Sequence, residues 1–228
     1  MPAPARYDGI ADWYDRYIRD DRSGFTAEVQ ATLQRLLGRG AGSCLDLGCG
    51  TGISIPTLAG LGWRVTGVDI SADQLEVART RHGIDAVELV QASADQLPFE
   101  DDAFDAAAAV LVHTDLDDQA AAFDEAARVL QPGAPFALVC VHPCFEGGHV
   151  EKLEDNTRRL HPGYHEPGWA PDVRFSTTGV RARVGVNHLP LATLLNLLLD
   201  AGFLLDRFEE DTLSTLPHFL GIRAVRRS

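Results

Sequence analysis

The sequence predicts an α/β fold, a doubly wound and mostly parallel sheet with helices on both faces. Apolar, β-branched runs alternate with segments of helical period through the first two thirds of the chain, which is typical of repeated βα units. A glycine-rich turn, LDLGCGTG at 45–52, follows the first of these runs. The length of 228 residues, with 45% hydrophobic and 23% charged residues, suits one folded domain over 1–228.

Continuous apolar runs mark the parallel strands, because such strands are buried on both faces. The runs predict strands at about 43–48, 64–69, 86–91, 104–112 and 134–142. Between the second and third strands, Ser71 and Gln74 form a capping box that begins a helix. Another helix is expected over about 117–130, because Pro132 and Gly133 then signal a stop and a turn.

Near the C-terminus a leucine pattern predicts the clearest helix of the chain. Leucines recur at helical spacing from Leu191 to Leu199, with Pro190 at the start and Gly202 at the end. Strand candidates follow at about 203–209 and 217–226. Because only a short segment separates them, they should form an antiparallel hairpin.

The segment 143–189 interrupts this alternation of strands and helices. It is rich in Gly, Pro, His and aromatic residues and is too long for an ordinary connection. One interpretation is a mobile surface loop. The aromatic side chains Tyr164, Trp169 and Phe175 favour the other interpretation, an insertion that caps a substrate.

The charge of the chain opposes some classes of partner. A formal net charge of −13 disfavours nucleic acid and anionic membranes, so we expect neither as a partner. The first residues lack the apolar core of a signal peptide, and the longest apolar run, 106–112, is too short to span a bilayer. We therefore expect a cytoplasmic protein, and the sequence predicts no oligomeric state.

The four cysteines are expected to be small buried thiols. Cys140 and Cys144 flank a histidine, but no second Cys or His pair stands at the spacing of a structural zinc site. No metal site is expected.

The spacing of the glycines indicates what lies against the turn. A dinucleotide turn has the pattern G-x-G-x-x-G, whereas Gly48, Gly50 and Gly52 form G-x-G-x-G and Ile53 occupies the place of the third dinucleotide glycine. Pro56, in the first turn of the next helix, also removes a backbone donor. Phosphate is therefore not the obvious ligand.

Two carboxylates accompany the glycines. Asp69 ends the second strand, where an acid can accept hydrogen bonds from ribose hydroxyls, so a nucleoside without phosphates fits this turn. Asp46, just before the glycines, can face a cationic group such as an amine. The alternative is that Asp46 only caps the turn and that Asp69 only caps the following helix.

Three motifs together resemble class I S-adenosylmethionine-dependent methyltransferases, in particular the small-molecule group typified by ubiquinone and menaquinone biosynthesis. They are Leu45 to Gly52, then VTGVDIS at 65–71, then QLPF at 96–99 followed by Phe104-Asp105. The resemblance covers about 40–142 and implies a Rossmann-like sheet of seven strands whose last strand is antiparallel.

The resemblance also implies a cofactor and a set of residues that bind it. The cofactor would be S-adenosylmethionine, with Asp46 near its amino group, Asp69 on the ribose hydroxyls and Ile70 on the adenine. Ser93 and Ala94 stand where the family often has an acid that contacts the adenine. The N-terminal segment 1–30 resembles the lid of this group. The full set of expected cofactor residues is Tyr14, Asp46, Gly48, Cys49, Gly50, Gly52, Asp69, Ile70, Ser93, Ala94 and Leu111.

Methyl transfer requires alignment of the acceptor and, where the nucleophile bears a proton, a base. His113 and His142 lie at the carboxyl ends of predicted strands and His188 precedes the leucine helix, so these three are the candidate catalytic bases. The expected reaction is transfer of the methyl group to an O, N or C atom of a small molecule, which could be aromatic. The alternatives are a nucleoside-cofactor-binding protein without methyl transfer and a nicotinamide-dependent oxidoreductase.

Overall fold

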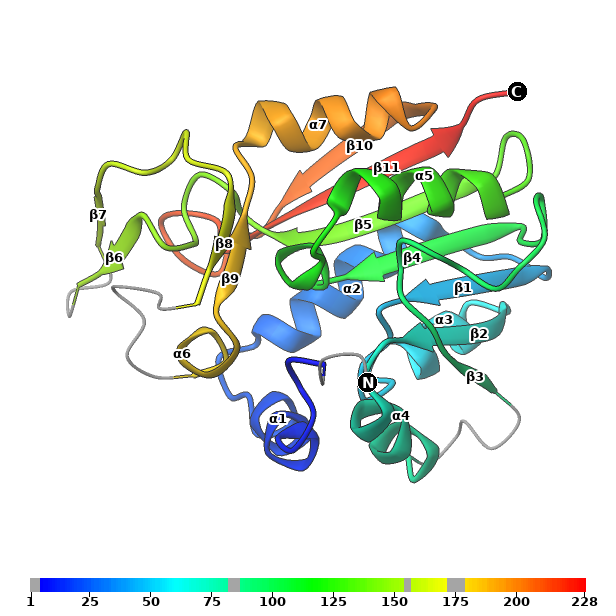
Figure 1. Ribbon diagram of the computed structural model, residues 1–228, viewed down its shortest axis with the longest axis horizontal. Coiled ribbons are helices and arrows are strands. Elements are labelled where there is room, and N and C mark those ends of the chain that lie inside the picture. Colours follow the sequence, from blue (N-terminus) through cyan, green and yellow to red (C-terminus); the bar gives the residue numbers. More distant parts are fainter. Residues whose placement is uncertain (1–4, 82–86, 154–156, 172–178) are drawn as a thin grey trace.

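A central sheet with helices on both faces forms the body of the molecule (Figure 1). The computed structural model describes residues 5–81, 87–153, 157–171 and 179–228. The sheet has seven strands in the order β10-β11-β5-β4-β1-β2-β3. These strands are Ser43–Leu47 (β1), Arg64–Asp69 (β2), Glu88–Gln91 (β3), Ala106–Val110 (β4), Pro135–Val141 (β5), Phe203–Glu210 (β10) and Phe219–Arg226 (β11).

Strand β1 lies between β2 and β4 and pairs in parallel with both. The pairs β2 with β3 and β4 with β5 are also parallel, whereas β11 runs antiparallel to both β5 and β10. The predicted fold class, the hairpin and the antiparallel last strand are therefore confirmed. This topology brings the carboxyl ends of β1, β2, β4 and β5 to one edge of the sheet, together with the amino end of β11.

Helices cover the two faces as the alternation of side chains along the strands requires. Leu45 and Ala107 pack in the core beneath α5 and α7, whereas Cys44 and Ala106 pack in the core beneath α2, α3 and α4. The helices are Ala11–Arg19 (α1), Phe25–Leu37 (α2), Ile55–Gly60 (α3), Ala72–Arg79 (α4), Gln119–Val129 (α5), Arg181–Val184 (α6) and Leu191–Asp200 (α7), with a 3-10 turn at His113–Asp115 (η1).

Capping residues set the starts of two predicted helices. The Ser71 hydroxyl accepts a hydrogen bond from the backbone N–H of Gln74 at 3.2 Å and caps α4. Helix α5 begins two residues later than predicted, because the Asp118 carboxylate accepts the backbone N–H of Ala121 at 3.0 Å. Pro190 precedes α7, as predicted.

Besides the later start of α5, one strand is shorter than predicted and one helix was not predicted. Strand β4 ends at Val110 rather than at 112, because Leu111 adopts a φ of 58° and turns the chain out of the sheet. Helix α2 was not predicted. It begins after Gly24, which has a φ of 83°, and it buries Leu33 and Leu36 against the sheet.

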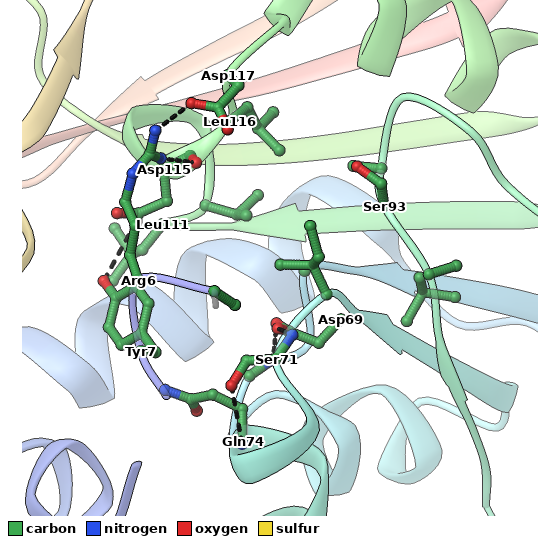
Figure 2. Close-up of a pocket in the computed structure, with 18 of the residues that line it drawn as sticks. Arg6, Tyr7, Asp69, Ser71, Gln74, Ser93, Leu111, Asp115, Leu116 and Asp117 are labelled. Atoms are coloured by element: carbon green, nitrogen blue, oxygen red, sulfur yellow. Dashed lines mark hydrogen bonds and ion pairs between the residues drawn. The ribbon is translucent and has the colours of Figure 1, made fainter. Parts of the chain in front are cut away.

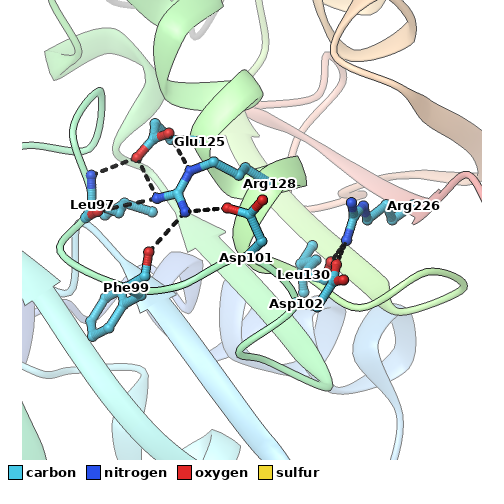
Figure 3. A network of polar contacts seen from close by, with 8 residues as sticks. All are labelled: Leu97, Phe99, Asp101, Asp102, Glu125, Arg128, Leu130 and Arg226. Atoms are coloured by element: carbon cyan, nitrogen blue, oxygen red, sulfur yellow. Dashed lines mark hydrogen bonds and ion pairs between the residues drawn. The ribbon is translucent and has the colours of Figure 1, made fainter.

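The QLPF motif is held by a polar network on α5 (Figure 3). The Arg128 guanidinium donates to the carbonyl oxygens of Phe99 at 2.8 Å and Leu97 at 3.1 Å, and to the Asp101 carboxylate at 2.8 Å. The Glu125 carboxylate accepts the backbone N–H of Leu97 at 2.7 Å. The loop after β3 is therefore fixed to α5.

The segment 143–189 forms short pieces outside the sheet rather than a bare loop. They are Val150–Lys152 (β6), Arg158–Leu160 (β7), Gly168–Ala170 (β8), α6 and Val186–His188 (β9). Residues 1–4, 154–156 and 172–178 of the expected lid and cap, with Phe175, and position 86 of the third predicted strand lie outside the described residues. Within the described ranges, no helix combines the length and the apolar character needed to cross a bilayer.

Candidate functional site

A cavity of about 380 Å³ opens at the carboxyl ends of β1, β2 and β4 (Figure 2). Its walls come from the glycine turn, the tip of β2, the loop after β3, the chain after β4 and the N-terminal segment. The residues from these elements that matter below are Arg6, Tyr7, Tyr14, Gly48, Gly50, Asp69, Ile70, Ser71, Ser93, Ala94, Leu111 and Asp115.

The glycine turn forms one wall of this cavity with bare backbone. Gly48 has a φ of 68°, and a Cβ atom on it would lie 2.3 Å from Cγ2 of Val112. Gly50 has a φ of 53° and donates its backbone N–H to the Asp69 carboxylate at 2.8 Å. Left-handed conformations and the contact with Val112 therefore explain the glycines at these positions.

Asp69 joins the glycine turn to the start of α4. Its second carboxylate oxygen accepts the backbone N–H of Ser71 at 2.9 Å. Burial raises the pKa of Asp69 to about 6, although the two backbone hydrogen bonds oppose the rise. Each oxygen retains a lone pair on the cavity side of the turn, which is the arrangement that a pair of ribose hydroxyls requires.

Asp46 is a buried carboxylate beneath the turn. It exposes 1% of its surface, and its Oδ2 atom has no hydrogen-bond partner among the described residues. Burial, and then the charge of Asp69, raise the pKa of Asp46 to about 7. An acid left without a partner suits a nearby cation, so the site fits a cofactor with an amino group and a sulfonium.

The structure brings most of the predicted cofactor residues to this cavity. Tyr14, Gly48, Gly50, Asp69, Ile70, Ser93, Ala94 and Leu111 line it. Asp46, Cys49 and Gly52 do not line it, and Cys49 is a buried thiol under the turn. Ile70 is 55% exposed, which leaves an apolar surface at the cavity mouth that a flat ring would cover.

The N-terminal segment lines the cavity with Arg6, Tyr7 and Tyr14. Polar contacts hold this segment at both of its ends. Arg6 contacts the Asp117 carboxylate and the carbonyl oxygen of Asp115 (Figure 2). The Tyr7 hydroxyl donates to the Asp115 carboxylate at 3.3 Å. Further along, the carboxylate of Asp15 pairs with Arg81, whose Nε donates to the carbonyl oxygen of the glycine turn at Thr51.

A second cavity of about 1050 Å³ adjoins the first. Both cavities are lined by Tyr14, Val110 and Leu111, so they meet at the tip of β4. The strained φ of Leu111 lies at this junction. The other walls of the second cavity come from α1, the start of α2, the insertion and the loop between β10 and β11; among them are Trp13, Tyr17, Phe25, Val141, Glu146, Arg181 and His218.

Arg181 of the insertion connects the two cavities. Its guanidinium donates to both oxygens of the Asp115 carboxylate, at 2.7 and 3.2 Å. Asp115 lines the first cavity and Arg181 lines the second. The insertion is therefore tied by a two-point ion pair to the chain that follows β4.

None of the three predicted histidine bases lines either cavity. His113 is 3% exposed, and burial, with the charges of Arg181 and His188, lowers its pKa to about 3. His142 uses both ring nitrogens: Nδ1 accepts the Cys144 N–H at 3.2 Å, and Nε2 lies 2.9 Å from the Glu210 carboxylate. His188 donates from Nε2 to the carbonyl oxygen of Tyr164 at 2.8 Å.

Sequence reasoning missed His218, which lines the second cavity. Its Nδ1 lies 3.1 Å from the carboxylate of Asp211, a residue that is 5% exposed. A signal was present, because His218 immediately precedes the last strand. The amino end of an antiparallel last strand lies at the same edge of the sheet as the carboxyl ends of its neighbours.

Comparison with known proteins agrees with this geometry. Residues 45–138 match the family model of the methyltransferase domain. An O-methyltransferase of Penicillium expansum is 44% identical over 110 residues, which cover 44% of this chain and 39% of that protein. A demethylmenaquinone methyltransferase of Clavibacter sepedonicus is 37% identical over 136 residues, which cover 59% of this chain and 56% of that protein.

A solved structure extends the likeness over nearly the whole fold. The S-adenosylmethionine-dependent methyltransferase of Mesorhizobium loti superimposes with a TM-score of 0.72 at 24% identity, over 92% of this chain and 100% of that one. The chain spans less than two thirds of the length of each of the two curated relatives. Residues 45–138 are therefore similar to a methyltransferase domain, and the chain has the fold of this solved S-adenosylmethionine-dependent methyltransferase.

Proposed function

We propose that the protein transfers the methyl group of S-adenosylmethionine to an O, N or C atom of a small, flat molecule. The single observation that carries the proposal is the meeting of two cavities at the tip of β4. The first has the glycine turn and Asp69 of a nucleoside site. The second, lined by aromatic side chains from α1, would hold the acceptor beside it.

In this proposal each wall of the first cavity has a role. Asp69 accepts hydrogen bonds from the ribose hydroxyls, Ile70 and Leu111 pack on the adenine, and Ser93 with Ala94 contacts its edge. Asp46, beneath the turn, favours the positive charge of the cofactor. When bound, the cofactor supplies a methyl group on a sulfonium, and the protein aligns the acceptor with it.

The remaining segments would exclude water. The N-terminal lid closes the first cavity through Arg6 and Tyr7, and the insertion 143–189 caps the second. The name of one curated relative includes a small-molecule acceptor, demethylmenaquinone. The name of the other, an O-methyltransferase, specifies transfer to oxygen. A net charge of −13 argues against a nucleic-acid acceptor.

A product assay tests the proposal. The protein is incubated with S-adenosylmethionine carrying an isotopically labelled methyl group and a panel of phenols, carboxylic acids and amines. We expect S-adenosylhomocysteine to form in equal amount with one labelled acceptor. Cofactor binding without S-adenosylhomocysteine above the protein-free rate would favour the alternative, a binding protein without methyl transfer.

A further inference from the structure

We infer that His218 is the general base of this methyl transfer and that the acceptor is a small aromatic compound bearing a hydroxyl group. The inference rests on the proposed function and narrows it. It assigns the proton acceptor to the Asp211–His218 pair at the start of β11, in place of the three histidines indicated by the sequence.

His218 is the only imidazole that lines either cavity in the part of the chain that the structure describes. Asp211 fixes its ring, because the carboxylate lies 3.1 Å from Nδ1. Asp211 is itself held by the backbone N–H groups of His218 at 2.6 Å and Phe219 at 2.9 Å. A carboxylate on Nδ1 places the proton there and leaves the lone pair on Nε2.

The position of His218 suits an acceptor that lies across the tips of the strands. Its carbonyl oxygen accepts the backbone N–H of His142 at 2.8 Å, so it stands beside the end of β5. Val110 and Leu111, where the two cavities meet, end the neighbouring β4. Two strand spacings, roughly 10 Å, separate β4 from β11, and a ring-sized acceptor with the imidazole fills that width.

Two carboxylates that line this cavity already have partners. The Asp21 carboxylate accepts the backbone N–H groups of Ser23 at 2.9 Å and Thr26 at 2.8 Å. Glu146 pairs with Lys152 at 2.8 Å and also with Arg158.

The groups nearest to the junction and to the ring do not replace the imidazole. Burial raises the pKa of Tyr14, so its hydroxyl is a donor rather than a base. On the elements packed around the ring, His142 pairs with Glu210 at 2.9 Å, and Phe25 presents its ring at 6.2 Å between centroids. The Nε2 atom of His218 is therefore the group that we assign to take the proton of the acceptor.

The aromatic walls indicate the body of the acceptor. Trp13 and Tyr17 of α1 stack with their centroids 5.2 Å apart, and Tyr14 and Phe25 line the same cavity. Such walls favour a flat ring. A fixed base suits a nucleophile that must lose a proton as it attacks, which describes an aromatic hydroxyl group, whereas a neutral amine attacks with its free electron pair.

The proposed step balances as follows. Nε2 of His218 takes the proton of the aromatic hydroxyl, and the oxygen forms a bond to the methyl carbon while the carbon–sulfur bond breaks with its electron pair on sulfur. The products are the methyl ether, S-adenosylhomocysteine and an imidazolium, which returns its proton to water.

The test compares His218→Ala with the exposed control His165→Asn, using S-adenosylmethionine and a series of substituted phenols. We expect kcat of His218→Ala to fall about 100-fold or more with a weakly acidic phenol. The loss should nearly vanish with 4-nitrophenol at pH 8, which is ionised without a base. In His218→Ala, the dependence of kcat on pH should follow the ionisation of the phenol itself.

Asp211→Asn should lower kcat less than His218→Ala and change the pH profile, and both variants should bind S-adenosylhomocysteine as the wild type does. An equal loss for all phenols, or wild-type turnover in His218→Ala, would overturn the assignment of the base. Methylation of amines alone would overturn the acceptor class. The proposed function fails separately, if the wild type binds no S-adenosylmethionine or forms no S-adenosylhomocysteine with any acceptor.

Discussion

The two cavities that meet at the tip of β4 are built in different ways. The first is made of strand tips and backbone: its glycine turn, Asp69 and Ser71 lie in two consecutive βα units and are joined by hydrogen bonds. The second is made of side chains from α1, α2, the insertion and the last hairpin, which are far apart in the sequence.

This difference in construction is what we expect of one site for a ligand that many proteins bind and another site for a ligand particular to this protein. A nucleoside can be held by a turn that recurs in many proteins, because the backbone provides its contacts. An acceptor needs a shape of its own, and segments added to the sheet provide it. We therefore expect substitutions in the turn to reduce cofactor affinity, and substitutions in the added segments to act mainly on the acceptor and on closure.

The largest effect is expected from Gly48→Ala. Its Cβ would lie 2.3 Å from Val112 on a backbone with a φ of 68°, so the turn must shift. We expect S-adenosylhomocysteine to bind about 100-fold more weakly, from roughly 3 kcal/mol of strain. The matched control is Gly133→Ala, where φ is 80° and no atom lies within 4 Å of the added Cβ. Calorimetric titration should show no loss there, and equal losses in both variants would refute this explanation.

Asp46→Asn is expected to stabilise the cofactor-free protein. The folded-state pKa of about 7 lies above the ordinary 3.8. The fold therefore favours the protonated acid, and stability falls as pH rises from about 4 through 7. Asn carries no charge, so the free energy of unfolding should increase by roughly 1–3 kcal/mol at pH 8 and by less at pH 5.

Urea denaturation at the two pH values measures this effect. Asp105→Asn is the control of opposite sign, because hydrogen bonds from Ser43 lower the pKa of Asp105 and favour its charged form. That variant should lose stability at pH 8. A stabilisation by Asp46→Asn that does not depend on pH would show that Asp46 is not a strained buried acid.

Asp115→Asn should weaken ligand binding in both cavities. The carboxylate joins Tyr7 of the lid to Arg181 of the insertion, and its loss leaves the guanidinium of Arg181 without its counter-charge. We expect the KM values of cofactor and acceptor to rise about tenfold, with faster amide exchange in 5–19 and 179–188. Asp117→Asn, which removes an exposed pair with Arg6, should change each KM about twofold or less. A change confined to one KM would contradict the coupling.

The smallest effect is expected from Trp169→Ala. The Arg6 guanidinium lies 3.6 Å from the centroid of the Trp169 ring and links the lid to the insertion. Loss of a cation–π contact of about 0.5–1 kcal/mol should weaken cofactor binding roughly threefold. The cofactor affinity of Trp169→Phe should fall between those of the wild type and Trp169→Ala. An unchanged affinity in Trp169→Ala would mean that this contact does not hold the lid.

The sequence predicted the parts of the molecule whose determinants are local. Strand runs, the Ser71 cap and the glycine spacing each depend on a few adjacent residues, and apart from the ends of β4 the structure has them where they were expected. Helix α2 was not predicted, because its N-cap is Gly24 in a left-handed conformation rather than a residue with a polar side chain.

The contacts of the N-terminal segment and the insertion were predicted less well, because they join distant residues. Arg181 and Asp115 are 66 positions apart, and Arg6 and Asp117 are 111 apart, so no spacing rule reveals them. The histidines show a related limit. His142 does stand at the end of β5, but its ring nitrogens are engaged by Cys144 and Glu210, and position along a strand does not show which partners a ring will find.

The most direct test of the account is a parallel titration of the wild type and Asp69→Asn with S-adenosylhomocysteine and NAD. We expect the wild type to bind S-adenosylhomocysteine and not NAD. We also expect that Asp69→Asn weakens binding about tenfold or more, because an uncharged amide replaces the acceptor of the ribose hydroxyls, while thermal unfolding shows the variant folded. Binding of NAD, or equal affinity of both proteins for S-adenosylhomocysteine, would contradict the assignment of the first cavity.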